Sequence, residues 1–484
     1  MPSASKRPVY IFGHRNPDAD AICSALAYAD FKRRTTEGTY QPARCGNTNA
    51  RIDAILSLFQ VEPPPFIGDV TPRLRDHMSE APAVLGPRDT CARALALMDE
   101  HDVQVVPVVD GKGRLEGLVS IFQMGAYFVP QVGSGQDIRR VDTSLQSIVD
   151  ALGAEPLHLE DADTVRTLYV RVGAMQLDTF MEYQENGELP PNSWVLVVGD
   201  RRDIQLEAIR RGVHLLVVTG GRSVDPDVVE AAREAGTSLV VSPRETATTA
   251  WTIRAAVPVS RVMDSEPETF GPDETVESVR RRTNELGQSV FAVTDEGRRL
   301  LGLFTHRDLL RPSPVRLILV DHNEMAQAVE GAGQVQVEEV IDHHRLGDLR
   351  TEGPILFLNR PVGSTCTIVA DLYRQAGLQP TRAIAGVLMG GLVSDTLNLR
   401  SPTTTDLDRE ILAWLEERTG VTGEELAEHT FRSGSFVAAH EPAEVLQLDR
   451  KAYEEDGVRF AISQVEELGF DEFWKRASDL GDAL

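Results

Sequence analysis

The sequence predicts an α/β protein in which a doubly wound parallel-sheet domain is interrupted by a long insertion. A short apolar strand at residues 8–12 is followed by a polar loop and by small and apolar residues at helical spacing over residues 20–32. Apolar strands that end in Asp and His residues return at residues 316–320 and 340–341. Between them lies an interval with an internal repeat. One sheet assembled from both ends of the chain, around an inserted module, accounts for these three observations.

Composition disfavours several classes of partner. Of the 484 residues, 42% are hydrophobic, and 49 basic against 74 acidic side chains give a formal net charge of −25. So acidic a balance disfavours binding to nucleic acid or to an anionic membrane, and we expect neither. No apolar run reaches the ~18 residues of a membrane helix, and the first residues lack the apolar core of a signal peptide. We therefore expect a cytoplasmic protein.

The cysteines agree with a reducing compartment. They are Cys23, Cys45, Cys91 and Cys366, and no two of them form a CxxC pair. Such wide spacing suits neither a disulfide framework nor a thiolate zinc site. We expect four reduced thiols.

The inserted interval contains two copies of one pattern. Proline-rich segments at residues 63–65 and 311–314 bound it, and inside it Met78 matches Met263, an offset of 185 residues that holds without a gap. Each copy has the pattern of a strand, a helix, two short strands joined by a turn, and a last helix. Units this small are expected to pack on one another, either as a plain duplicated scaffold or as a ligand-binding pair.

Both copies resemble CBS domains, the cystathionine-β-synthase type. The family motif Gly-x-x-Ser/Thr-x-x-Asp falls on Gly302, Thr305 and Asp308 in the second copy and on Gly117, Ser120 and Gln123 in the first. The resemblance implies an adenine nucleotide, such as AMP, ADP, ATP or a diadenosine polyphosphate, and a homodimer through the CBS domains. The hydroxyl would meet phosphate and the carboxylate the ribose. Because Gln is a weaker acceptor than Asp, we expect the second half-site to be the better one.

The segment between the repeats predicts a parallel sheet of its own. Three continuous apolar runs and two helical stretches alternate, at residues 193–199, 203–211, 214–219, 227–235 and 238–241. This segment resembles the DRTGG domain, with Gly-Asp-Arg at 199–201 and Val-Thr-Gly-Gly at 218–221. Ligands of open α/β sheets bind at such strand ends, but Gly-Gly is also ordinary turn chemistry, so both interpretations stay open.

A cluster of metal-ligand side chains follows the first strand. His14, Asp18 and Asp20 lie within seven residues, in a loop before a helix. An isolated Asp at this place would serve as a helix cap, whereas one imidazole and two carboxylates together can converge on a divalent cation.

Three later segments add further ligand types. Asp321 and the pair His343 and His344 follow strands, and a helical segment at 383–392 leads to Asp395. Strand ends and adjoining loops are where a doubly wound sheet places its site. Even with one histidine of the pair counted, six candidate ligands exceed one ordinary site, which indicates two metals about 3.5 to 4 Å apart acting on phosphate esters or anhydrides. The sequence has no Walker loop, nor a GxGxxG after a strand, to support an NTPase or a dehydrogenase.

These motifs together resemble family II inorganic pyrophosphatases of the DHH phosphoesterase superfamily, in the regulated branch with an inserted CBS–DRTGG–CBS region. The matching segments are residues 13–28, 320–324, 340–344, 361–365 and 401–404. The resemblance implies hydrolysis of pyrophosphate to two phosphates, with two Mn²⁺ or Co²⁺ ions and a Mg²⁺ that accompanies the substrate.

The resemblance also assigns residues. It implies one metal held by His14, Asp18 and Asp321, and another held by Asp20, Asp321, His343 and Asp395, with Asp321 bridging the two. His344 would contact phosphate and protonate the leaving oxygen.

The charge of this centre calls for basic side chains. Four carboxylates balance two divalent cations, so an anionic substrate needs further positive charge. In the family this comes from a C-terminal DHHA2 domain, whose start resembles residues 448–453, and Lys451 would supply one contact. The late Ser-Arg-Lys-Lys-type motif of that domain does not occur in the 484 residues. The resemblance therefore implies a partial DHHA2 domain and weak turnover of pyrophosphate.

The expected domains follow the chain. They are the DHH catalytic domain, first part, at 1–67, CBS domain 1 at 68–125, a DRTGG-like domain at 126–254, CBS domain 2 at 255–312, the DHH domain, second part, at 313–440, and a partial DHHA2 domain at 441–484.

Two other functions remain as hypotheses. One is a DHH phosphodiesterase of oligonucleotides or cyclic dinucleotides, which usually carries a DHHA1 domain with a GGGH-like segment that this sequence lacks. The other is an adenine-nucleotide sensor with weak catalysis, and the complete set of ligand residues argues against loss of the site.

Overall fold

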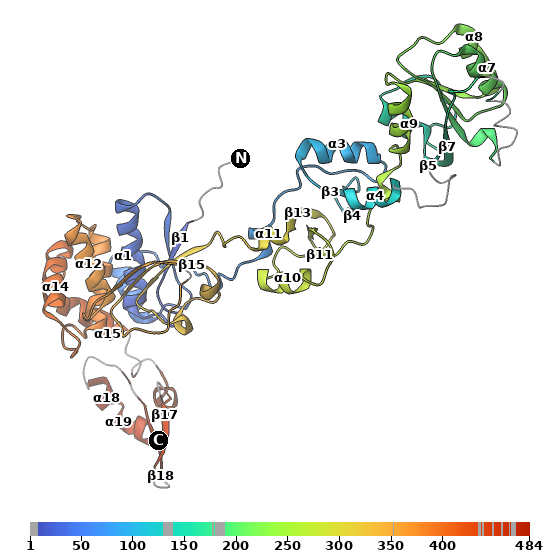
Figure 1. Ribbon diagram of the computed structural model, residues 1–484. Helices are drawn as coiled ribbons and strands as arrows, with labels where there is room; N and C mark the ends of the chain where they lie inside the picture. The colour runs from blue at the N-terminus through green and yellow to red at the C-terminus, as the bar shows by residue number, and fades with distance from the viewer. Residues whose placement is uncertain are drawn as a thin grey trace. The chain divides into compact units, whose positions relative to one another are not determined.

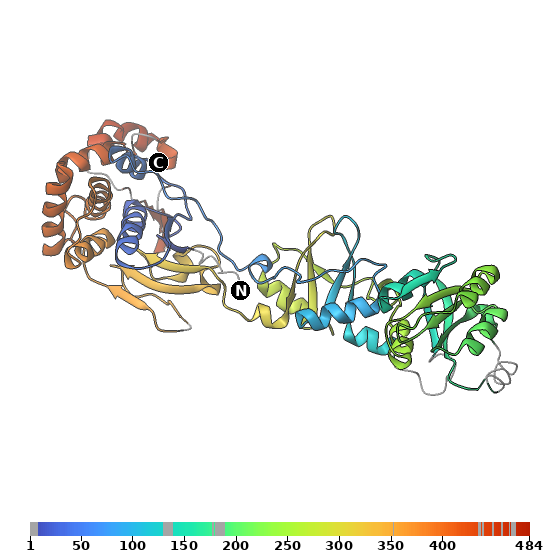
Figure 2. The ribbon, with the colours of Figure 1, turned by 90° about the horizontal axis from the view of Figure 1, so that it is seen from above.

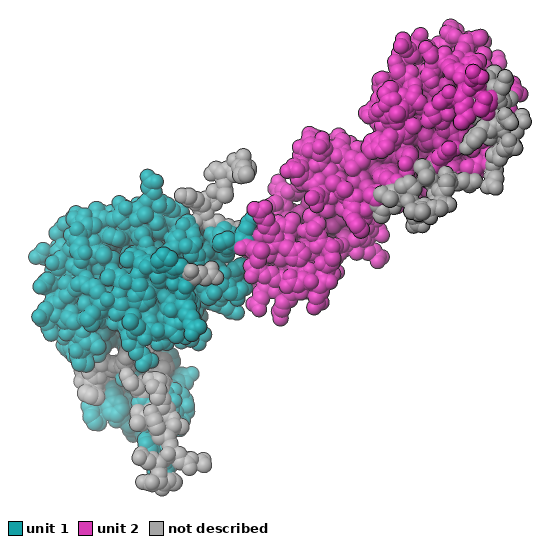
Figure 3. Space-filling view, in the orientation of Figure 1, with its two compact units in different colours: residues 1–72, 311–484 teal, residues 73–310 magenta. Residues whose placement is uncertain are grey.

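The computed structural model describes residues 8–128, 139–176, 179, 189–351, 353–433, 437, 440–447, 450–455, 458–463, 465 and 471–484. The chain forms two compact units, one comprising Met1–Pro72 with Arg311–Leu484 and the other Arg73–Leu310 (Figure 3). The first unit thus comes from both ends of the chain, as a domain interrupted by an insertion requires.

A five-stranded parallel sheet forms the centre of the first unit. Its strands are β1 (Val9–Phe12), β2 (Tyr40–Ala43), β14 (Arg316–Val320), β15 (Gln336–Asp342) and β16 (Leu356–Asn359), in the order β16-β15-β14-β1-β2. β1 therefore pairs with a strand about 300 residues away, with Ile11 opposite Ile318. The order reverses between β1 and β14, and this switch point is where open α/β sheets bind ligands.

Helices cover one face of this sheet. They are α1 (Ala19–Thr35), α2 (Ala50–Leu58), α12 (Thr365–Gln375), α13 (Arg382–Asp395), α14 (Asp406–Thr419) and α15 (Gly423–Ser433). Figures 1 and 2 show them on the same side of the sheet. Alternate strand residues, such as Ile11 and Ile318, pack into this main core, while their neighbours Phe12 and Leu317 point to the other face. Irregular segments and two short 3₁₀ helices, η5 (Met325–Gln327) and η6 (Ala332–Gln334), cover that second face.

The C-terminal part of the first unit is a small separate segment. It contains α17 (Pro442–Val445), a hairpin of β17 (Lys451–Glu455) and β18 (Val458–Ile462), α18 (Asp471–Lys475) and α19 (Ala477–Asp482). Lys451 begins β17, whereas Leu448 and Asp449 of the predicted DHHA2 start lie outside the described residues. Among the described residues, no helix is long and apolar enough to cross a membrane.

The two repeats of the second unit have closely similar elements. The first has α3 (Cys91–His101), β3 (Val105–Val109), β4 (Leu115–Ser120) and α4 (Ile121–Phe128), and the second has β11 (Thr269–Phe270), α10 (Val276–Thr283), β12 (Val290–Thr294), β13 (Leu300–Thr305) and α11 (His306–Leu309). Thr90 and Thr275, matching positions, cap α3 and α10 through their hydroxyl oxygens. The predicted first strand forms in the second copy only, and in the first copy it is reduced to a single bridge between Leu85 and Val108.

The middle segment is a six-stranded sheet, in the order β5-β7-β8-β9-β10-β6. Its elements are β5 (Arg140–Thr143), α5 (Leu145–Leu152), β6 (Glu155–His158), β7 (Arg166–Val172), β8 (Trp194–Val198), α7 (Arg202–Arg210), β9 (Leu215–Val218), α8 (Pro226–Ala235), β10 (Ser238–Val241) and α9 (Thr246–Arg254). The strands β8, β9 and β10 are parallel, as the apolar runs predict, and β7 joins them in parallel, while the edge strands β5 and β6 pair antiparallel. The described part of the second unit also contains the short 3₁₀ helices η1 (Leu74–Asp76), η3 (Pro191–Ser193) and η4 (Val259–Arg261).

Candidate metal centre

The candidate ligands meet at the switch point of the first sheet. His14 and Asp18 lie between β1 and α1, Asp20 is in the first turn of α1, Asp321 follows β14, and His343 follows β15. Because carboxyl ends of parallel strands share one edge of a sheet, residues over 300 positions apart become neighbours.

Asp395 reaches the centre from a different kind of element. We predicted that the ligands lie at strand ends or adjoining loops, but Asp395 is the last residue of helix α13. The helical pattern continues through residues 393–395 because Val393 is buried against the core. Its Oδ2 atom lies 3.3 Å from His343 Nε2.

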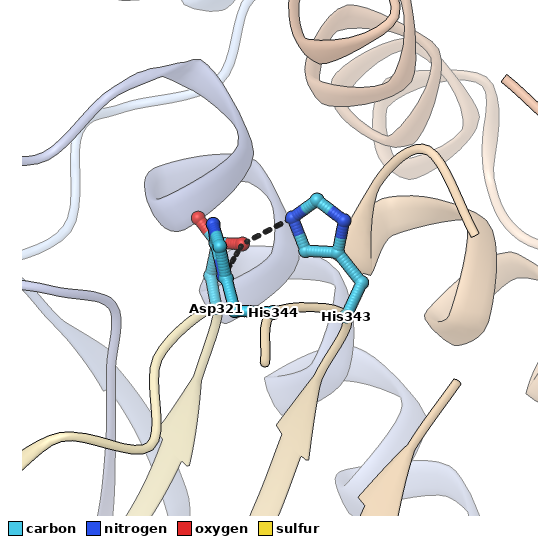
Figure 4. A group of neighbouring side chains, drawn as sticks. All are labelled: Asp321, His343 and His344. Carbon is cyan, nitrogen blue, oxygen red and sulfur yellow. Dashed lines mark ion pairs between the residues drawn. The ribbon is translucent and has the colours of Figure 1, made fainter. Parts of the chain in front are cut away.

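Asp321 lies at the middle of the group. Its Oδ1 atom is 3.4 Å from His343 Nε2, and its Oδ2 atom is 3.5 Å from His14 Nε2. Figure 4 shows this carboxylate at the end of β14, with ion pairs to His343 and His344. The residue is 1% exposed and has a left-handed backbone, with φ of 64°, which is uncommon for a residue other than glycine. Such strain is typical of functional sites, where the surroundings hold it in place.

Three groups of ligand atoms lie at or beside this carboxylate. In each group, one atom per residue lies within 4.8 Å of the others, and the groups are His14, Asp18 and Asp321; Asp20, His343 and Asp395; and Asp321, His343 and His344. The two carboxylate oxygens of Asp18 have different partners. Its Oδ1 atom accepts a hydrogen bond from Ala21 N at 2.9 Å and so caps α1, while its Oδ2 atom lies 3.6 Å from His14 Nε2. The cap and the ligand interpretations of this residue are therefore compatible.

The donor atoms suit a divalent cation. His343 Nδ1 lies 3.0 Å from the carbonyl of Val362, which fixes the proton on Nδ1 and leaves the Nε2 lone pair for a metal. Within the described residues, His343 Nε2 and Asp321 Oδ2 are buried without a hydrogen-bond partner. A metal ion bound between these two side chains would give both buried atoms a partner.

The electrostatics of the group point the same way. Burial, followed by the charges of Asp321 and Asp395, raises the pKa of Asp20 well above its usual value. Burial also raises the pKa of Asp395 to about 7. Although burial opposes it, the neighbouring carboxylates of Asp18 and Asp321 raise the pKa of His14 to about 10. The charged form of these buried carboxylates is therefore destabilised, and bound cations would stabilise it.

A loop and a buried aspartate hold the ligands in place. Asp20 accepts hydrogen bonds from Ser364 Oγ at 2.8 Å and from Thr365 N at 2.6 Å, and Thr365 Oγ1 donates to Asp321 Oδ1 at 2.9 Å. The fully buried Asp408 accepts from Gly363 N at 2.9 Å and from the hydroxyl of Thr367 at 2.6 Å. Asp408 therefore fixes both sides of the segment that orients two ligands.

Sequence reasoning missed these supporting residues. Residues 361–365 and 401–404 were identified only as matching segments. The one available signal was the capping box of Thr405 and Asp408, which predicts a helix start but not a contact 45 residues upstream.

His344 has a different environment from His343. It is half exposed, and its Nδ1 atom lies 2.9 Å from Oδ1 of the buried Asp342, which Asn323 also contacts. Asp342 thereby determines which ring nitrogen of His344 is left for other partners. The role predicted for Lys451 remains a prediction.

The two CBS motifs have the same local geometry. Asp308 Oδ2 accepts from Thr305 N at 2.8 Å and from its hydroxyl at 2.7 Å, and Gln123 Oε1 accepts from Ser120 N at 2.8 Å and from its hydroxyl at 2.9 Å. Gln therefore replaces Asp in this capping role. A cavity of about 250 Å³ adjoins Ser120 and Gln123, in the copy for which the sequence expectation was weaker.

The motif glycines have a packing role. A Cβ atom on Gly302 would lie 2.6 Å from the carbonyl of Ser79, and one on Gly117 would overlap the carbonyl of Asp264. These strands approach the backbone of the partner repeat, forming single bridges at Leu303 and Leu118. Glycine is required there for close contact between the copies.

Comparisons with known proteins agree with this architecture. The CBS domain model matches residues 74–123 and 259–313, and the DRTGG domain model matches residues 147–256. The cobalt-dependent inorganic pyrophosphatase of Clostridium perfringens is 33% identical over 480 residues, covering 99% of this chain and 86% of the relative. A Thermotoga maritima protein, named a probable manganese-dependent inorganic pyrophosphatase, is 32% identical over 461 residues, covering 94% and 82%.

One similar solved structure contains the inserted region. It is that of the CBS and DRTGG domains of Clostridium perfringens pyrophosphatase, complexed with the activator diadenosine tetraphosphate. It is 27% identical, covers 48% of this chain and 99% of that chain, and has a TM-score of 0.43. Near-full-length identity to the two enzymes, together with the matched domains, decides the family. The chain belongs to the manganese- and cobalt-dependent, family II inorganic pyrophosphatases, in the branch with inserted CBS and DRTGG domains.

Proposed function

We propose that this chain hydrolyses pyrophosphate to two phosphates at a centre of two Mn²⁺ or Co²⁺ ions. One ion would be held by His14, Asp18 and Asp321, and the other by Asp20, Asp321, His343 and Asp395. The observation that carries this assignment is the placement of Asp321, whose two oxygens face two different imidazoles at 3.4 and 3.5 Å. A bridging carboxylate needs this arrangement.

The chain's own residues supply orientation and protons. When bound, the divalent cations would neutralise substrate oxygens and lower the pKa of the attacking water. Asp342 holds His344 through Nδ1 at 2.9 Å, so the proton that His344 would give to the leaving phosphate is on Nε2. As the P–O bond breaks, that proton passes to the oxygen of the departing phosphate. Lys451 would add positive charge near the substrate, which arrives with Mg²⁺.

Substitution of Asp321 tests the assignment. Asp321→Asn should lose Mn²⁺, as measured by elemental analysis, and lose hydrolysis of pyrophosphate, because an amide cannot bridge two cations as a carboxylate does. Asp53→Asn, an exposed aspartate on α2, is the matched control. Full retention of two Mn²⁺ ions in Asp321→Asn would remove Asp321 from the bridging role.

We further propose that adenine nucleotides bind between the CBS copies and regulate the enzyme. The supporting features are the two matched CBS models and the cavity of about 250 Å³ beside Ser120. Ser120, Gly302, Thr305 and Asp308 would make the contacts, with AMP, ADP, ATP or diadenosine polyphosphates as ligands. Asp308→Ala should weaken AMP binding by roughly 2 kcal/mol in calorimetry, by loss of charge-assisted hydrogen bonds to ribose. Unchanged AMP affinity would place the nucleotide elsewhere.

A homodimer through the CBS domains and a cytoplasmic location complete the proposal. Ile121 and Phe122 on α4 are 50% and 85% exposed, an apolar surface that a second copy would cover. Phe122→Ser should shift sedimentation towards the monomer, and an unchanged dimer would exclude this surface. The four cysteines are free thiols, as a reducing compartment favours. Recovery of the chain outside the cytoplasm after cell fractionation would contradict this location.

A further inference from the structure

A second cavity in the regulatory unit lies apart from the CBS motifs. It has a volume of about 470 Å³, and its lining includes Arg88 and Arg93 at the start of α3, and Arg244 and Trp251 at α9. The cavity therefore lies between the first CBS copy and the DRTGG domain. This size is within the range of small-molecule sites, which occur preferentially where domains meet.

The two walls of this cavity pack against each other. Residues of α3, α5 and α9 contribute to one hydrophobic core, which includes Ala94, Ile148 and Ile253. The first N–H groups of α3 also donate across the junction, Cys91 N to the carbonyl of Val257 and Ala92 N to that of Ala255, both at 2.8 Å. The cavity is thus built into a packed junction.

The charge of the cavity favours an anion. Its carboxylates are engaged locally, since Asp89 accepts from Gly86 N at 2.7 Å and Asp150 accepts from Gln146 Nε2 at 2.8 Å. Within the part of the chain that the structure describes, Arg88, Arg93 and Arg244 form no ion pair. Three guanidinium groups without a carboxylate partner among the described residues therefore line one cavity, in a chain of net charge −25. Guanidinium groups match phosphate oxygens through paired N–H donors.

Trp251 indicates that the ligand also has a planar ring. Its side chain is 60% exposed, although an indole ring is among the side chains most stabilised by burial. An exposed aromatic face beside guanidinium groups is a platform on which a planar ring can stack. The N–H groups at the start of α3 are already engaged, including Arg93 N with the hydroxyl of Thr90 at 3.2 Å. The ligand must therefore be held by side chains.

We propose that this cavity is a second nucleotide site, separate from the one between the CBS motifs. The phosphates contact Arg88, Arg93 and Arg244, and the base stacks on Trp251. A nucleoside phosphate is the ligand class that combines a planar ring with clustered anionic charge. Because its walls come from two domains, an occupied site stiffens the junction between the first CBS copy and the DRTGG domain.

Fluorescence of the full chain tests the base contact. Titration with ATP in the absence of Mg²⁺ should quench tryptophan emission, and the quench should be lost in Trp251→Phe, since the other tryptophans, at 194, 414 and 474, do not line this cavity. A quench of the same size in Trp251→Phe would overturn the proposal.

Calorimetry tests the phosphate contacts. Arg88→Gln combined with Arg93→Gln should weaken ATP binding at this site roughly tenfold or more, and Arg233→Gln, an exposed arginine on α8, is the matched control. Tripolyphosphate should compete with ATP in the wild type. Equal ATP affinity in the double variant and the control would overturn the proposal, and so would binding of ATP only at the Ser120 cavity.

Discussion

The candidate metal centre of the first unit and the cavities of the second hold their polar side chains in different ways. Asp20 and Asp321 are almost completely buried, and residues 363–367 with Asp408 fix their orientation. In the second unit, the guanidinium side chains that line the cavity beside α3, those of Arg88, Arg93 and Arg244, are exposed. Buried charges without their partners are costly, whereas exposed groups exchange partners with water at little cost. The first region should therefore respond sharply to substitution or metal loss, and the second gradually.

Removing the metals should have the largest effect, and it should be confined to the first unit. Two ions at free concentrations of 100 times their Kd would each stabilise the fold by about 2.7 kcal/mol. In differential scanning calorimetry, a chelator should lower the transition of the first unit, while ATP should raise only that of the second. Equal shifts of both transitions by the chelator would contradict the separation of the two regions.

Gly391→Ala should damage the centre through packing alone. A Cβ atom there would overlap Cys366 Sγ and lie 2.8 Å from Asp20 Oδ1, so the ligand must move. We expect a loss of about 1–3 kcal/mol in stability and incomplete Mn²⁺ occupancy by elemental analysis. Gly333→Ala, at a position with open space, is the control. Full occupancy in Gly391→Ala would show that Asp20 tolerates displacement.

Asp408→Asn tests whether a residue that only orients the candidate ligands affects metal binding. The amide oxygen cannot accept the hydrogen bonds of Gly363, Thr367 and Thr405 as the carboxylate does. Mn²⁺ affinity should fall roughly tenfold to a hundredfold in a metal titration, as for other residues that orient metal ligands. Asp406→Asn, an exposed neighbour on α14, controls for the charge. If stability falls while Mn²⁺ affinity stays unchanged, Asp408 only holds the fold.

Ser120→Ala and Thr305→Ala should have the smallest effects, and equal ones. Each removes a capping hydroxyl with the same geometry in its repeat. The second unit should lose about 1 kcal/mol of stability in either variant, as measured by urea denaturation. Ser260→Ala, at an exposed position in the same unit, provides the baseline. Unequal losses of stability would mean that Gln123 does not perform the capping role that Asp308 has in the second repeat.

Local patterns in the sequence determined much of this protein. Short continuous apolar runs predicted β1, β14 and the strands β8, β9 and β10 of the middle domain, because a strand buried in a parallel sheet is covered on both faces. The repeat at an offset of 185 residues predicted two equivalent units, and ligand types after strands predicted a metal centre. Covalent order along the chain is sufficient for inferences of this kind.

Only the tertiary structure decided which distant side chains meet. The pairing of β1 with β14 brings His14 to Asp321, and a helix end, not a strand, delivers Asp395. The contact of Asp408 with Gly363, and the cavity that combines Arg93 with Trp251, depend on how helices pack across a sheet or between domains. Periodicity says which face of an element is apolar but not which element covers it, so contacts between segments are set by the packing of the whole fold.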